Sequence, residues 1–161
     1  MGTNLGDRAE NLRRALVQLG DRFEVTAVSP IYETEPTYYL DQAQFLNQCC
    51  LARTELSSLD TLTHLKHSET ALGRVPGARF GPRLIDLDLL FYDDLVLTSP
   101  ELTVPHPLLH ERAFVLVPLN DIAPAVIHPT LGVSVRELFE LLSDEEKRKV
   151  WVVGGEEGTV A

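Results

Sequence analysis

Apolar side chains recur along the first part of the chain at the spacing of one helical face. This stripe consists of Leu12, Ala15, Leu16 and Leu19. Asp7 and Glu10 stand in capping-box spacing before it, and Gly20 follows its last member. The pattern therefore predicts a first helix that begins near Asp7 and ends at Gly20.

The rest of the chain alternates between strand and helix patterns, without repeats or clear linkers. Pro- and Gly-containing segments at 35–44 and 73–83 are predicted to be loops. Further helices are predicted at 57–72, 109–119 and 133–142, and strands at 23–29, 45–54, 84–92, 95–98, 102–104 and 149–153. This order favours a single α+β domain over residues 1–161, a sandwich with helices on one side of a mostly antiparallel sheet.

The segment 84–92 has the strongest strand pattern. Its predicted inner face consists of Ile85, Leu87, Leu89 and Phe91. Asp86 and Asp88 share the other face, about 6.5–7 Å apart along the strand. Two aspartates on one face repel each other, and magnesium, as one ion or as two bridged by carboxylates, would relieve that repulsion. A solvated outer face is the alternative explanation of this motif.

Charge is distributed unevenly in this acidic chain. The net charge of −10 argues against general nucleic-acid binding. Arg74, Arg79 and Arg83 nevertheless fall within ten residues, just before the two aspartates. Phosphoryl transfer commonly uses arginines that bind phosphate oxygens together with carboxylates that hold a metal ion. We therefore expect a small anionic ligand.

Three further residues could either bind a ligand or have a purely structural role. His106, between Pro105 and Pro107, could donate a hydrogen bond to a phosphate or simply belong to a turn. Arg112 is a further cation or a surface residue. Glu69 lies on the apolar face of the predicted helix 57–72, as a site residue or as a carboxylate that reaches an arginine.

An aromatic ring and an amide are expected on one face of the strand 45–54. Phe45 and Asn47 would offer a stacking surface and a donor–acceptor pair to a flat heterocycle, although Phe45 alone also suits a core. The neighbouring Cys49 and Cys50 are predicted to be reduced packing residues. The chain shows no signal peptide and no membrane span, so that a cytoplasmic location is the default expectation.

Five short motifs occur together in the chain. They are G-T-N-L-G-D at 2–7, Y-E-T-E-P at 32–36, F-L-N at 45–47, G-P-R-L-I-D-L-D at 81–88 and V-P-H-P at 104–107. In this order and spacing, from residue 2 to about 129, they resemble the 6-hydroxymethyl-7,8-dihydropterin pyrophosphokinases. The G-P-R-x-x-D-x-D block is specific, and its combination with the other motifs makes coincidence improbable.

The resemblance implies an activity and its small-molecule partners. The β,γ-diphosphate of ATP would be transferred to the hydroxymethyl group of the dihydropterin, with release of AMP. It also implies a ferredoxin-like α+β core, two magnesium ions at Asp86 and Asp88, and a mobile lid at 73–83 that excludes water. Fusion or association with another folate enzyme occurs in the family.

The resemblance also implies roles for individual residues. Phe45 and Phe114 would sandwich the pterin, Asn47 and the backbone near Thr34 and Thr37 would read its edge, and Gly2 would pass close to it. Arg74, Arg83, His106 and Arg112 would lie near the ATP phosphates, with Arg79 as a further lid cation and Glu69 as a supporting residue. Arg74, Arg83, Asp86 and Asp88 are the predicted catalytic set.

Three departures from the family pattern bear on these expectations. Pro76 stands where some members have arginine, and Phe80 where some have tryptophan. The apolar strand that precedes G-T-N in the family is largely missing, because Met1 falls essentially at its end. Either the sequence starts at an internal methionine, or residues 149–153 or a second copy fill the gap. We expect lower stability or an unusual strand arrangement.

Two alternatives keep other functions open. A protein with the same fold could bind pterin or nucleotide without turnover. An acidic interaction module with a solvated D-x-D face would show no magnesium-dependent ATP binding.

Overall fold

The computed structural model describes residues 1–153, and its strands form one larger and two smaller antiparallel sheets. The main sheet has the order β1 (Gly2–Thr3), β4 (Phe45–Asn47), β3 (Tyr32–Thr34) and β8 (Val150–Val152). The other sheets pair β2 (Glu24–Val28) with β5 (Cys50–Arg53), and β6 (Leu97–Thr98) with β7 (Thr103–Val104). The expectation of a mostly antiparallel sheet is confirmed.

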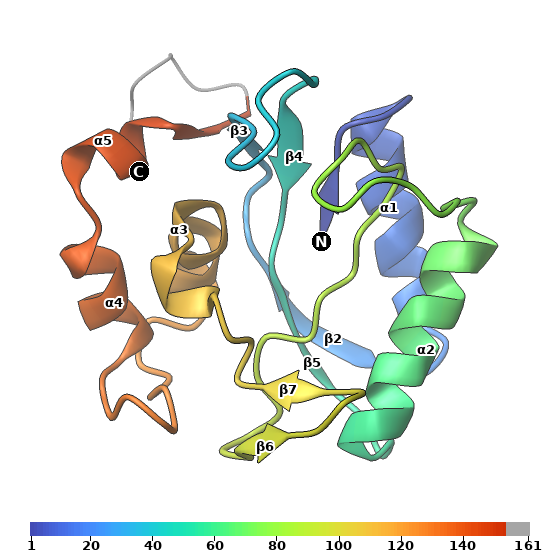
Figure 1. Ribbon diagram of the computed structural model, residues 1–161. Helices are drawn as coiled ribbons and strands as arrows, with labels where there is room; N and C mark the ends of the chain where they lie inside the picture. Colours follow the sequence, from blue (N-terminus) through green and yellow to red (C-terminus); the bar gives the residue numbers. More distant parts are fainter. Residues whose placement is uncertain (154–161) are drawn as a thin grey trace.

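Helices lie on two sides of these strands, with α1 and α2 on one side and α3 and α4 on the other (Figure 1). The helices are α1 (Arg8–Leu19), α2 (Ser58–Ala71), α3 (Ala113–Ile122), α4 (Val135–Leu141) and α5 (Asp144–Arg148), with a 3₁₀ turn at Leu109–Glu111. The prediction that helices cover one side only is therefore wrong. Leu46 packs in the core beneath α1 and α2, whereas Tyr32 packs against α3, so that both faces of the sheet are apolar.

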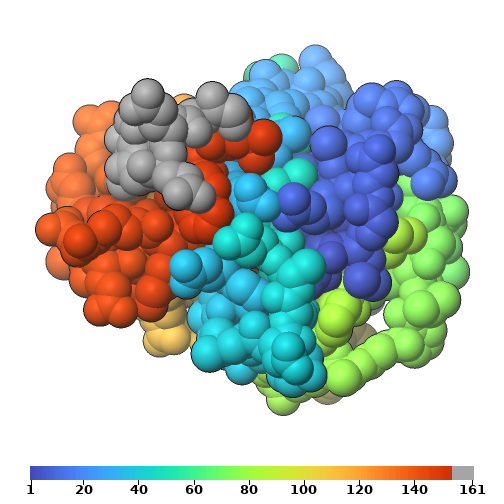
Figure 2. Space-filling view, turned by 90° about the horizontal axis from the view of Figure 1, so that it is seen from above, coloured from blue at the N-terminus to red at the C-terminus, as the bar shows by residue number. Residues whose placement is uncertain are grey.

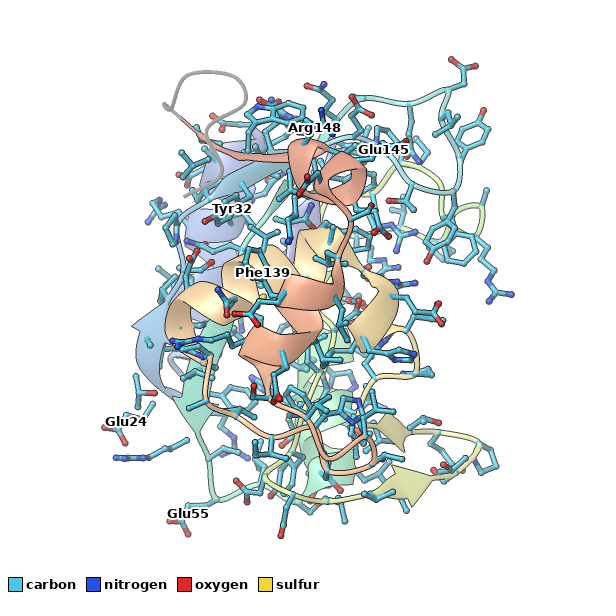
Figure 3. The ribbon with its side chains drawn as sticks, turned by 90° about the vertical axis from the view of Figure 1, so that its left-hand side faces the viewer. Glu24, Tyr32, Glu55, Phe139, Glu145 and Arg148 are labelled. Carbon is cyan, nitrogen blue, oxygen red and sulfur yellow. The ribbon has the colours of Figure 1, made fainter. Side chains whose placement is uncertain are left out.

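The α3 side of the sheet is closed by the C-terminal part of the chain. Tyr32 is 1% exposed, its ring packs beside Phe139 of α4, and its hydroxyl donates a hydrogen bond of 2.6 Å to Asp121 (Figure 3). The strand predicted at 149–153 is confirmed as β8, which pairs with β3. Residues 154–161 lie outside the described part.

Local signals placed the first two helices correctly. The Asp7 side chain caps α1 by accepting from the Glu10 amide, although the Glu10 side chain pairs with Arg13 instead of completing the capping box. Ser57 caps α2 in the same way through the Asp60 amide. None of the described helices is long and apolar enough to cross a membrane.

Two predicted strands differ in the structure. The strand expected at 45–54 is divided at Gln48 and Cys49, which bond to Met1 and Ser29, and the short strand β3 was missed. In the segment 84–92 only Asp86 forms a bridge, with Gly2. Its Ile85 and Leu87 pack under α1 and α2 as predicted, but Phe91 packs on the α3 side.

The amino-terminal strand is short but present. Gly2 pairs with Asn47 of β4 and with Asp86, so β1 connects these two segments. The idea that residues 149–153 replace a missing first strand is wrong, because β8 lies at the opposite edge of the main sheet, beside β3. Cys49 and Cys50 are free thiols, and burial raises the pKa of Cys49 to about 11, as expected of a packing residue.

Candidate functional site

One pocket of about 370 Å³, here called the site pocket, brings the motif residues together. It lies between the ends of β3 and β4, the loops 35–44 and 73–83, and the segment from His106 to Phe114. All predicted site residues line it except Glu69 and Arg74. Those that line it are Gly2, Thr34, Thr37, Phe45, Asn47, Arg79, Arg83, Asp86, Asp88, His106, Arg112 and Phe114.

The strands β1, β3 and β4 build an apolar and amide-rich end of the pocket. Asn47 Nδ2 donates to Thr34 Oγ1 over 2.7 Å across the β3–β4 pair. This bond fixes the amide, whose oxygen faces Gly2 on the neighbouring strand. Phe45, on the same strand face, and Phe114, in the first turn of α3, also line the pocket. A flat ring with polar edges suits these surfaces.

Gly2 has a steric reason to be glycine. A Cβ atom at this position would lie 2.9 Å from Asn47 Oδ1, which is closer than van der Waals contact. We expect Gly2→Ala to displace the Asn47 amide and to weaken binding of a hydroxymethylpterin about tenfold, the loss of roughly one good hydrogen bond. Fluorescence titration measures this, with Gly77→Ala as the control because its added Cβ meets nothing within 4 Å. Unchanged pterin affinity in Gly2→Ala would contradict this role.

The acidic side of the pocket is a compact ion-pair network. Asp86 accepts from Arg74 at 2.6 Å and from Arg83 at 2.7 Å, one through each carboxylate oxygen. Burial alone would raise the pKa of the Asp86 carboxyl, but the charges of Arg83, Arg74 and Lys66 outweigh it and hold that pKa below its ordinary value. Asp86 is therefore an anion at neutral pH.

Glu69 lies behind this network rather than in the pocket. Its side chain is 5% exposed and accepts from the Leu87 amide at 2.6 Å, from Lys66 Nζ at 3.0 Å and from Arg74 at 2.7 Å. Lys66 also donates to the Leu87 carbonyl at 3.2 Å. Helix α2 thus holds both the arginine and the aspartate segment, and Glu69 supports the site instead of facing a ligand.

The donor set suits a hard divalent cation. Asp86 and Asp88 both line the pocket, and within residues 1–153 the exposed Asp88 makes no ion pair. No cluster of three or more His, Cys, Asp or Glu side chains that could enclose a metal occurs in the same range. Magnesium needs only one or two carboxylates when phosphates and water complete its shell, so the residues present fit it.

His106 and Arg112 extend the polar wall. His106 Nδ1 accepts from the Leu108 amide at 3.2 Å, which leaves Nε2 as the hydrogen-bearing nitrogen of the neutral ring. Burial lowers the pKa of His106. Arg112 lies 5.5 Å from the centre of the Phe114 ring. Both residues can therefore donate hydrogen bonds into the pocket.

The two loops touch each other over the pocket, and Figure 2 shows residues 35–44 beside the light-green loop 73–83 at the lower edge of the view. Tyr38 stacks on Phe80 with ring centres 4.4 Å apart. Gln42 Nε2 donates to the Phe80 carbonyl at 2.8 Å, and Gln42 Oε1 accepts from Asn4 at 2.9 Å. These contacts join the predicted lid to the opposite wall.

We expect Tyr38→Ala to loosen the loop 73–83. A stacked aromatic pair contributes about 0.5–1.5 kcal/mol, so that trypsin should cut after Arg79 roughly two to ten times faster, because cleavage follows opening. Tyr39→Ala is the control, since Tyr39 is a 49% exposed ring in the same loop. Equal cleavage rates in both variants would mean that the stack does not hold the loop.

Sequence reasoning missed four residues that shape the site: Asn4, Tyr38, Gln42 and Lys66. Asn4 belongs to a motif, and its side chain accepts from the Arg83 amide at 2.9 Å, which the motif gave no means to foresee. Tyr38 and Gln42 contact Phe80, which lies 42 and 38 residues further along the chain. The contact of Lys66 with Glu69 could have been predicted, because Lys66 stands three residues before Glu69 on the same helix face.

The arginines, carboxylates and aromatic rings that line the pocket are suited chemically to a phosphate-bearing ligand and a planar ligand. Residues 1–124 match the family model for 7,8-dihydro-6-hydroxymethylpterin-pyrophosphokinase (HPPK). The chain therefore belongs to the HPPK family.

Individual relatives agree with this assignment. The 2-amino-4-hydroxy-6-hydroxymethyldihydropteridine pyrophosphokinases of Bacillus subtilis and Aquifex aeolicus are 39% and 36% identical over 94% and 85% of this chain, and 87% and 86% of their own lengths. The folic acid synthesis protein of Dictyostelium discoideum is 41% identical over 85% of this chain. The match spans only 21% of that protein.

Proposed function

We propose that this protein transfers diphosphate from ATP to 6-hydroxymethyl-7,8-dihydropterin, and that AMP is the second product. The observation that carries the proposal is the site pocket, in which Asp86, Asp88 and the surrounding cations share one cavity with Phe45, Asn47 and Phe114. The names of the Bacillus and Aquifex relatives support this substrate pair.

The reaction needs charge neutralisation more than covalent chemistry. The hydroxymethyl oxygen forms a bond to the β-phosphorus and loses its proton to the solvent. The bond from that phosphorus to the oxygen that bridges it to the α-phosphate breaks, and this oxygen leaves as part of AMP. Arg83, His106 and Arg112, which line the pocket, would bind phosphate oxygens and stabilise the charge that develops on them, while Arg74 would hold Asp86 from behind the pocket. Two magnesium ions at Asp86 and Asp88 would supply further positive charge when bound.

The pterin would occupy the amide-rich end. Phe45 and Phe114 would stack on its faces, and Asn47, held by Thr34, would hydrogen-bond to its edge beside Gly2 and Thr37. This arrangement would aim the hydroxymethyl group toward Asp86 and Asp88. Arg79 and the loop 73–83 would then cover ATP and keep water from competing for the phosphorus.

AMP release from ATP and magnesium, with and without hydroxymethyl-dihydropterin, tests the proposal. Pterin-dependent AMP is the expected result. A folded protein that binds pterin or ATP but forms no AMP would instead be a binding protein of the same fold. A chain without magnesium-dependent ATP binding would be an interaction module.

The multifunctional relatives raise one more proposal. The pea relative, a folate synthesis bifunctional protein, is 42% identical to this chain over 25% of its own length. We propose that this unit can work next to another enzyme of the same synthesis.

A further inference from the structure

Five side chains that line the site pocket form one continuous stack, here called the aromatic bridge. Its members, in order, are Arg79, Phe80, Tyr38, Arg112 and Phe114. The guanidinium carbon of Arg79 lies 4.8 Å from the centre of the Phe80 ring, which stacks on the Tyr38 ring with centres 4.4 Å apart. The guanidinium carbon of Arg112 lies 5.4 Å from the centre of the Tyr38 ring and 5.5 Å from that of Phe114.

The aromatic bridge joins three parts of the chain that are distant in sequence. Its first two members belong to the loop 73–83 and its last two to the start of α3, and the loop 35–44 supplies Tyr38. Figure 2 shows the two loops side by side. Tyr38 is the central member, because its ring contacts the predicted lid and its hydroxyl contacts Arg112.

Arg112 is held by neutral groups. Its Nε donates a hydrogen bond of 3.2 Å to the Tyr38 hydroxyl, and its guanidinium lies beside two aromatic rings. Among residues 1–153 no carboxylate forms an ion pair with it. Arg83, in contrast, pairs with Asp86 at 2.7 Å. Arg112 is therefore oriented by its neighbours while its positive charge is not neutralised by them.

This difference matters for an anionic ligand. An arginine that already pairs with a carboxylate must break or share that pair before it can bind a phosphate. An aromatic face and a hydroxyl attract a guanidinium without cancelling its charge. Since Nε is bonded to Tyr38, the two Nη groups of Arg112 are left for the oxygen atoms of a phosphate.

We propose that Tyr38 is a positioning residue for nucleotide binding, which holds Arg112 ready for the phosphate chain before the nucleotide arrives. The proposal rests on the proposed function, in which Arg112 binds phosphate oxygens. A long arginine side chain that is ordered in advance loses less entropy on binding, so that Tyr38 raises the affinity for ATP. The alternative is that Tyr38 acts only on the loop 73–83, through its stack on Phe80.

The affinity for α,β-methylene-ATP in the presence of magnesium tests the proposal. This analogue has no oxygen at the bond that the transfer would break, so calorimetry measures its binding without turnover. Tyr38→Leu, which removes the ring and the hydroxyl, should weaken binding about tenfold. Tyr39→Leu is the matched control and should bind as the unmodified protein does, since Tyr39 is a 49% exposed ring of the same loop outside the lining of the site pocket.

Tyr38→Phe separates the two routes. This variant keeps the ring that stacks on Phe80 but loses the acceptor for Arg112, so that it should bind the analogue about threefold more weakly. Its rate of tryptic cleavage after Arg79 should equal that of the unmodified protein. If affinity falls only in variants whose cleavage is faster, Tyr38 acts through the loop and the proposal is overturned.

A double-mutant cycle shows whether Arg112 carries the effect. In a protein that already has Arg112→Met, the change Tyr38→Leu should weaken binding by less than about twofold, because the side chain that it positions is gone. An equal loss with and without Arg112 would overturn the proposal, as would unchanged affinity in Tyr38→Leu. If the unmodified protein neither binds the analogue nor forms AMP, the proposed function fails as well. If it forms AMP while the Tyr38 variants bind normally, only the role of Tyr38 is wrong.

Discussion

Asp86→Asn is expected to reduce pterin-dependent AMP formation by about a thousand-fold or more. Asparagine has the same shape but no charge, so that it would hold neither Arg74 and Arg83, at 2.6 and 2.7 Å, nor a magnesium ion as the carboxylate does. The turnover rate at saturating ATP, magnesium and pterin measures this loss. Circular dichroism checks that the variant is folded.

Asp94→Asn is the matched control. Asp94 is an exposed aspartate in the turn that follows the same segment, outside the lining of the site pocket. It should retain the rate of the unmodified protein. If Asp86→Asn keeps more than about a tenth of the rate, the carboxylate does not act on the reacting phosphates.

Glu69→Ala is expected to lower the free energy of unfolding by about 2–3 kcal/mol and to reduce the turnover number. The change leaves the buried Leu87 amide without its acceptor and removes the carboxylate that holds Arg74 and Lys66. Since Glu69 does not line the site pocket, the loss should fall on the turnover number more than on KM for ATP. Urea unfolding and steady-state kinetics measure the two effects.

Glu69→Gln separates the two causes. The glutamine oxygen can still accept from the Leu87 amide but no longer pairs with the cations, so that this variant should recover part of the stability lost in Glu69→Ala. An unchanged urea midpoint in Glu69→Ala would argue against a supporting role for Glu69.

The helices were predictable because their signals are local. The stripe from Leu12 to Leu19 and the caps Asp7 and Ser57 define α1 and α2 within one or two residues. The strands β6 and β7 lie inside the segments predicted as strands at 95–98 and 102–104. The helix α5 was missed, since it is only five residues long and buries none of them.

Strands were predicted less well because they depend on partners. Nothing near Gln48 and Cys49 indicates that Met1 and Ser29 bind their peptide groups and divide the predicted strand. Tyr32–Thr34 becomes a strand by pairing with β4 and β8, the latter more than a hundred residues later. The alternation at 84–92 gave the right inner face up to Leu89 and failed at Phe91, where the chain passes to the second core.

The site was predictable to the extent that motifs carry it. The predicted residues other than Glu69 and Arg74 line one pocket, and these two lie behind it, bonded to each other. Their proposed roles stay predictions until ligands are tested. The contacts between loops, such as Tyr38 on Phe80, depend on how both loops fold and leave no local signal.

The boundary of the family match and the boundary of the folded unit are different places on this chain. The match ends at residue 124, and every predicted site residue lies before that point. Val135, Leu138 and Val150, which lie after it, are nevertheless buried against α3 and β3. A fragment that ends at residue 124 would keep every predicted site residue. It would lose core residues that pack against α3, and without β8 one edge of β3 would be exposed to solvent. A unit moved into another protein should therefore include the residues up to β8 and should not be cut where the family match ends.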